Sequence, residues 1–176
     1  MALGALVQDF QTLIVGVIGF AGVIITLVLN ARYAREQRRE ERHHECQSLR
    51  TALIEELRIN RESLAHNIDA INNGVSVPSE TGGYAMPTHP MDDAYRAFTH
   101  RLGLLTRAEV SKVMFAYLSL RTYHTSLFLI GVPTHASDRY VKVPAQNAQL
   151  LSGGLKSLIG PIEGAIEVLE RARDAG

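Results

Sequence analysis

The sequence LIVGVIGFAGVIITLVLN, residues 13–30, lies at the centre of an apolar run that extends from Phe10 to Ala31. No residue of this run is ionisable. A helix rises by about 1.5 Å per residue, so a run of this length suffices to cross a hydrocarbon core about 30 Å thick. The run therefore predicts a single transmembrane helix.

Three alternatives to a membrane span fit the apolar run less well. A cleaved signal peptide has a basic first region, a shorter apolar run and a small-residue cleavage site, and the sequence shows none of these. The core helix of a soluble protein is seldom apolar on every side over this length. A helix that lies in the membrane interface carries a charged face, which is missing here.

Basic residues close to the run predict its orientation in the membrane. Residues 1–9 contain no Lys or Arg, whereas five arginines follow the run at positions 32, 35, 38, 39 and 42. Basic residues favour the cytoplasmic side. We therefore expect a short extracytoplasmic tail, 1–9, and a cytoplasmic domain at a plasma membrane of the bacterial inner-membrane type.

Glycines recur at every third position of the predicted span, at Gly16, Gly19 and Gly22. Small residues let two membrane helices approach closely, so this strip is a candidate helix contact with a second copy or another subunit. Glycine is also common in membrane helices that make no such contact, and this second interpretation stays open.

Residues 32–45 are polar on every side and mix both signs of charge, which predicts a solvated, coiled-coil-like stalk after the span. The formal net charge of the chain is zero, which argues against general binding to nucleic acid. One cysteine excludes an internal disulfide. Apart from the bilayer, we expect a protein partner or a homo-oligomer, and neither a metal nor a cofactor.

Apolar residues at helical spacing predict an up-and-down antiparallel helical bundle over 46–176, with three long helices and one short helix. The long helices are expected at about 46–72, 106–130 and 144–173, and the short helix at 91–102. The inward stripe of the first comprises Cys46, Leu49, Leu53, Leu57, Asn60, Leu64, Ile68 and Ile71. That of the second comprises Val110, Val113, Met114, Tyr117, Leu120, Arg121, His124 and Phe128. That of the last comprises Leu151, Leu155, Leu158, Ile162, Ile166 and Leu169.

Two long loops, 73–90 and 132–144, connect the helices of this all-α fold. Tracing the direction of each helix places both loops at the end of the bundle farthest from the bilayer. Alternation within 140–143 indicates a short strand, for which 75–77 is the candidate partner.

Few polar residues fall on the inward stripes: Asn60, Arg121 and His124, with Tyr117 one turn before Arg121. A buried arginine needs a partner, because an uncompensated charge loses several kcal/mol of hydration. Two interpretations remain. Arg121 and His124 bind an anionic ligand, or Arg121 pairs with a carboxylate such as that of Glu56 while Asn60 bonds to the backbone.

No arrangement of nucleophile, base and orienting group is evident, so the sequence does not indicate an enzyme. The leading hypothesis is a single-pass membrane protein that acts as a scaffold, accessory subunit or protein-interaction module at the cytoplasmic face. The alternative is a ligand-responsive membrane sensor or effector with an anion site near Arg121 and His124.

Overall fold

The computed structural model describes the backbone of residues 2–74, 83–134 and 137–175. Among these residues, the side chains of 2–19, 21, 133–134 and 137–138 are not described. The chain divides into two compact units, Met1–His44 and Glu45–Gly176. One helix, α1 (Ala2–Asn72), contributes to both units.

The first unit consists of the amino-terminal part of α1. Much of the predicted transmembrane run, residues 10–19 and 21, lies outside the described side chains, and so do Gly16 and Gly19. A Cβ atom at Gly22 would contact nothing within 4 Å. Over the residues described, no helix has a long enough apolar stretch to cross a membrane. The predicted span is thus not supported by the described part of the chain.

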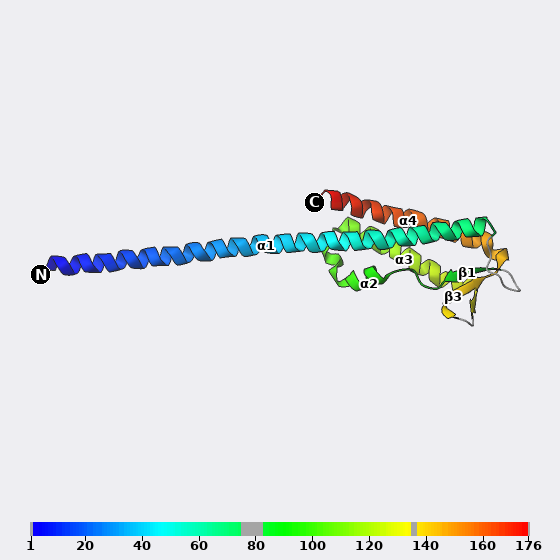
Figure 1. Ribbon diagram of the computed structural model, residues 1–176, viewed down its shortest axis with the longest axis horizontal. Coiled ribbons are helices and arrows are strands. Elements are labelled where there is room, and N and C mark those ends of the chain that lie inside the picture. Colours follow the sequence, from blue (N-terminus) through cyan, green and yellow to red (C-terminus); the bar gives the residue numbers. More distant parts are fainter. Residues whose placement is uncertain (1, 75–82, 135–136, 176) are drawn as a thin grey trace. The chain divides into compact units, whose positions relative to one another are not determined.

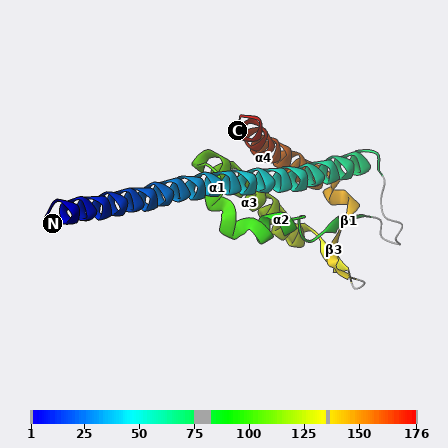
Figure 2. The same ribbon diagram turned by 60° about the vertical axis from the view of Figure 1, so that its left-hand side comes forward.

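The second unit is a helical bundle, which confirms the all-α prediction. The last part of α1 packs with α3 (Arg107–Ile130) and α4 (Ala148–Asp174), which run beside it in both views (Figures 1 and 2). The short helix α2 (Asp93–Phe98) continues into the 3-10 helix η1 (Thr99–Leu104), and a second 3-10 turn, η2 (Ala145–Asn147), precedes α4.

Two of the three predicted apolar stripes form the core as expected. From Leu49 to Ile71, every apolar residue of the α1 stripe is buried, and Cys46 is half-buried. All six residues of the α4 stripe are buried as well. These stripes are unambiguous, because each helix has apolar residues on one face and mostly polar residues opposite.

The stripe predicted for α3 is partly wrong. Val113, Tyr117, Leu120 and His124 are buried, but Met114, Arg121 and Phe128 are exposed, and Ala116 and Leu127 complete the core instead. The physical reason is that α3 carries large apolar side chains on two opposite faces. Hydrophobic periodicity therefore cannot decide which face is turned inward.

Both predicted loops contain strands, which the sequence analysis largely missed. Strand β3 (Ser137–Val143) is central, between β1 (Tyr84–Pro87) and β2 (Val132–Thr134), and both pairings are antiparallel. The strand expected at 140–143 is present as part of β3, and its expected partner, 75–77, lies outside the described residues. Because β1 and β2 pair with this part of β3, both of its edges are taken.

Polar residues of α1 bind the ends of neighbouring helices. Thr106 and Glu109 form the capping box predicted at the start of α3, and the Nε of Arg50 donates to Glu109 Oε1 at 2.7 Å. Burial raises the pKa of Glu109, but hydrogen bonds from Arg50 and Thr106 outweigh it and hold this pKa below its usual value. Gln47 donates to the carbonyl of Arg173 near the end of α4.

We predict that Glu109→Gln lowers the free energy of unfolding by about 2–4 kcal/mol, because it leaves the guanidinium of Arg50 nearly buried without its charged partner. Urea unfolding of the full chain in mild detergent, followed by circular dichroism, measures this change. The matched control is Glu167→Gln, which removes an exposed ion pair to Arg171 and should change the free energy by less than about 1 kcal/mol. Equal effects of the two substitutions would contradict the prediction.

Candidate functional site

Two polar residues of α1, one helical turn apart, hold the chain segment that leads into α2. The carboxylate of Glu56 accepts hydrogen bonds from the backbone N–H groups of Ala94 at 2.5 Å and Tyr95 at 3.0 Å. Asp92, the N-cap residue of α2, makes no side-chain capping bond. Glu56, which belongs to α1, therefore accepts the hydrogen bonds of N–H groups in the first turn of α2, where no capping side chain does so.

Asn60 binds the same segment through its amide group. Its Nδ2 donates to the carbonyl oxygens of Met91, at 2.7 Å, and Glu56, at 3.0 Å, while its Oδ1 accepts from the N–H of Met91. Three hydrogen bonds occupy both donors of the amide and one acceptor site. These hydrogen bonds fix the Asn60 side chain in place and hold Met91 against α1.

Tyr117 of α3 joins this cluster. Its hydroxyl donates to Glu56 Oε1 at 2.5 Å, and its ring stacks on that of Tyr95 with centroids 4.1 Å apart. Burial raises the pKa of Tyr117, and the hydrogen bond to Glu56 raises it further, so the phenol remains protonated as the donor. The carboxylate of Glu56 is the partner that the sequence analysis assigned to Arg121.

His124 is buried on α3, with 6% of its surface exposed. Its Nδ1 lies 2.9 Å from the carbonyl oxygen of Pro87, and a carbonyl can only accept, so Nδ1 carries the proton. Burial lowers the pKa of His124, and the hydrogen bond to Pro87 offsets this only in part. The ring is therefore neutral near pH 7, and its Nε2 is a hydrogen-bond acceptor with no partner among the described residues.

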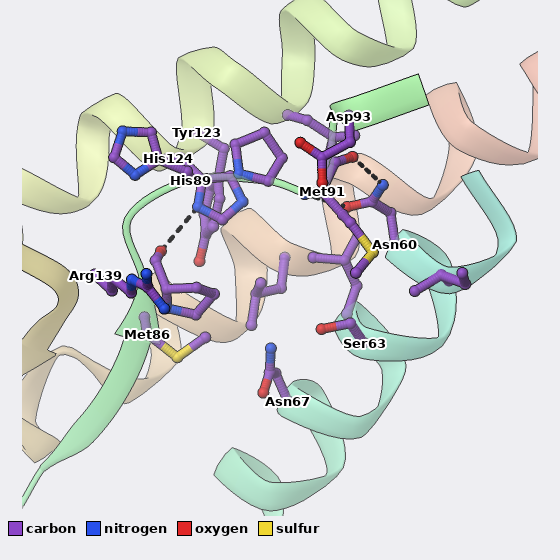
Figure 3. A pocket seen from close by; sticks show the side chains of 16 residues that line it. Asn60, Ser63, Asn67, Met86, His89, Met91, Asp93, Tyr123, His124 and Arg139 are labelled. Atoms are coloured by element: carbon purple, nitrogen blue, oxygen red, sulfur yellow. Dashed lines mark hydrogen bonds between the residues drawn. The ribbon is translucent and has the colours of Figure 1, made fainter. Parts of the chain in front are cut away.

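A cavity of about 510 Å³ lies beside His124 (Figure 3). Helix α1, the segment after β1 and α3 form most of its wall, and β3 and α4 each contribute one residue. Much of the lining is apolar, including Leu64, Leu120 and Leu155. Small-molecule sites have this size and this mixture of an apolar lining with a few polar groups.

The polar groups of the cavity lie on different sides. Ser63 and Asn67 of α1 line it, and their side chains make no hydrogen bond within the described residues. Arg139 of β3 and Asp93 of α2 lie at opposite sides of the labelled group, with His89 between them in this view (Figure 3). The cavity thus has a basic side and an acidic side.

The structure separates the residues predicted to form a site. Asn60 and His124 line the cavity, whereas Tyr117 is bonded to Glu56 and lines a different hollow. Arg121 is exposed and lines the same hollow as Tyr117, so the structure does not bring Arg121 and His124 together in one hollow. The two side chains leave α3 in directions about 60° apart, and this difference is enough to bury His124 and expose Arg121.

Five lining residues were not predicted from the sequence: Ser63, Asn67, His89, Asp93 and Arg139. Ser63 and Asn67 flank the apolar stripe of α1, where a polar residue normally faces water. His89 and Arg139 lie in segments expected to be loops. Only the β1 to β3 pairing brings Arg139 near α1, and no local pattern in the sequence reports that pairing.

Comparisons with protein-family models, with curated proteins and with solved structures found no match for this chain.

We predict that His124 makes the protein less stable in mild acid. Because its pKa is lowered in the folded state, the unfolded chain binds more protons, and stability falls as the pH drops from above 6.5 through the lowered pKa. His124→Gln should therefore show a smaller loss of Tm between pH 7.5 and pH 5 than the unsubstituted chain. The control is His66→Gln on the exposed side of α1, which should leave the pH dependence unchanged. Parallel Tm curves for all three proteins would refute the prediction.

Proposed function

We propose that this chain is a single-pass membrane protein whose helical domain binds a partner protein at the cytoplasmic face, as a scaffold or accessory subunit. The outer face of α3 carries the proposal. Five large apolar side chains of this helix are exposed: Met114, Phe115, Leu118, Phe128 and Leu129. A soluble surface rarely exposes so many large apolar side chains on one helix, unless the face binds something.

The arrangement of this face suits an amphipathic helix as the partner. From Met114 to Leu129 it extends for about 22 Å along α3, or four turns. A hollow of about 520 Å³ opens beside its first half, lined by Tyr95, Phe115 and Leu118 among others. Such a hollow can accept an apolar side chain of a helix that lies along α3.

Arg121 lies midway along the face and defines the charge of the partner. It lines the hollow and is exposed, so an acidic residue on the partner helix can pair with it. A second copy of α3 offers no such acid, since the polar residues on this face are Ser111, Arg121, Thr122 and Thr125. We therefore propose a different protein as the partner rather than a second copy of this helix.

The proposed membrane location is supported by the sequence. The apolar run 10–31 has the length of a span, and the arginines of 32–42 follow it directly. This location would confine the helical domain to the membrane surface, where an exposed apolar face meets membrane-bound partners in two dimensions.

Thiol labelling tests the orientation. Cys46 is half-buried and its Sγ lies 3.5 Å from the carbonyl oxygen of Leu104, so it is replaced by Ser and a new thiol is introduced at exposed Lys156. We expect a membrane-impermeant maleimide to label Lys156→Cys only after the cells are permeabilised. The control, Ala5→Cys in the predicted outer tail, should react in intact cells. The reverse pattern would refute the orientation, and release of the protein by carbonate washing would refute the anchor.

Photocrosslinking tests the partner face. A photoactivatable residue replaces Leu118 in the full-length chain, in membranes of cells that make the protein. We expect one discrete adduct, heavier than the chain and different in mass from its dimer, which Arg121→Glu reduces by about tenfold because it opposes the acidic partner. The same probe at exposed Glu163 of α4 is the control and should give no such adduct. An identical set of adducts at both positions, or a dimer, would contradict the proposal.

A further inference from the structure

The cavity beside His124 has features that the proposed partner face does not explain. It is separate from the outer face of α3: the two hollows share no lining residue. It is lined by residues from six helices and strands and from the segment between β1 and α2, so its shape depends on the complete fold of the second unit. Its polar groups also differ from one another in charge and in hydrogen-bonding role.

His124 supplies the firmest observation. The side chain is more than nine-tenths buried, Nδ1–H is committed to the Pro87 carbonyl, and Nε2 is left as an acceptor beside the cavity. A bound molecule that donates an N–H or O–H to Nε2 would form a hydrogen bond that no described residue supplies. The cavity therefore favours a ligand with a donor in its middle part.

The charged residues indicate what lies at the two ends of the ligand. Arg139 lines the cavity and has five N–H donors, which a ligand carboxylate would share with the contacts that Arg139 makes within the protein. Asp93, on the opposite side, is exposed and suits an ammonium group (Figure 3). A ligand with one kind of charge would be attracted at one side and repelled at the other, whereas a zwitterion with separated charges suits both.

Between the charged sides, the wall combines apolar and amide-binding groups. Leu64, Leu120 and Leu155 offer apolar contact, while Asn67 provides both an acceptor and two donors, as a peptide group requires. The volume of about 510 Å³ lies within the range of sites that bind small molecules. We propose that this cavity binds a short apolar peptide with free termini, its carboxylate at Arg139 and its ammonium at Asp93.

The test uses isothermal titration calorimetry of the full chain in detergent micelles with Ala-Leu-Ala as the probe. Its N-acetylated form, its C-terminal amide and 6-aminohexanoate are titrated in parallel. We expect the unblocked tripeptide to bind about fivefold or more tightly than either blocked form, since each block removes one charged hydrogen bond. The ω-amino acid has both charges but no peptide group, and should bind more weakly than the tripeptide.

Two substitutions assign the ends of the ligand to their residues. Asp93→Asn should weaken the unblocked tripeptide about fivefold and leave the affinity for its N-acetylated form unchanged, because that form has no ammonium. Arg139→Gln should likewise weaken binding of the unblocked tripeptide about fivefold. It should leave the affinity for the C-terminal amide unchanged, because that form has no carboxylate. Asp69→Asn, an exposed α1 residue outside the cavity, is the matched control and should alter neither affinity.

Three results would overturn the proposal. The first is no binding of the tripeptide at millimolar concentration. The second is equal affinity for blocked and unblocked forms, which would indicate an apolar hollow without recognition of the termini. The third is tighter binding of 6-aminohexanoate, which would assign the cavity to a ligand without peptide groups. Asp93→Asn keeps the test valid if Arg139→Gln fails to fold, since the Asp93 side chain makes no hydrogen bond or ion pair within the described residues.

Discussion

The buried carboxylate of Glu56 is the interaction on which the second unit depends. It joins α1 to the N–H groups of α2 and to the hydroxyl of Tyr117 on α3, so three helices share two oxygen atoms. A buried carboxylate is tolerated only when donors replace its lost water, and here three donors do so. Because those donors belong to two other elements, the charge favours one placement of α2 and α3 against α1.

Asn60 extends this constraint by one helical turn and gives the cavity its wall. It holds both backbone groups of Met91, which ties the segment between β1 and α2 to α1. Pro87, which immediately precedes this segment, contacts His124, and His89 within the segment lines the cavity. The space is therefore a consequence of polar contacts that keep a connecting segment away from the core, rather than of poor packing among the helices.

The stripes of α1 and α4 could be predicted from the sequence because each helix has a single apolar face. The start of α3 was also predictable, since Thr106 and Glu109 fulfil a local pattern. The inward face of α3 was not, because Met114 and Phe128 compete with Ala116 and Leu127 for the core. The same ambiguity that defeats prediction is what leaves α3 with an apolar outer face.

The site was less predictable than the fold, because its residues are brought together by pairings distant in sequence. Asn60 and His124 were recognised as polar residues on apolar stripes, but Arg139 reaches the cavity only through the β1 to β3 register.

The two asparagines in the wall differ in a way that bears on function. Asn60 uses its amide to hold the fold, whereas Asn67, two turns later on the same helix, makes no hydrogen bond to the described residues. An asparagine that stabilises a fold has its partners in place, and its removal leaves them unsatisfied. Asn67 and Ser63 instead are hydrated when the cavity is empty, and a ligand that replaces this water must reproduce its hydrogen bonds to gain affinity. An apolar molecule would lose those bonds, and a molecule of single charge would meet Asp93 or Arg139 unfavourably. The wall therefore selects for ligands that carry peptide-like groups between two opposite charges.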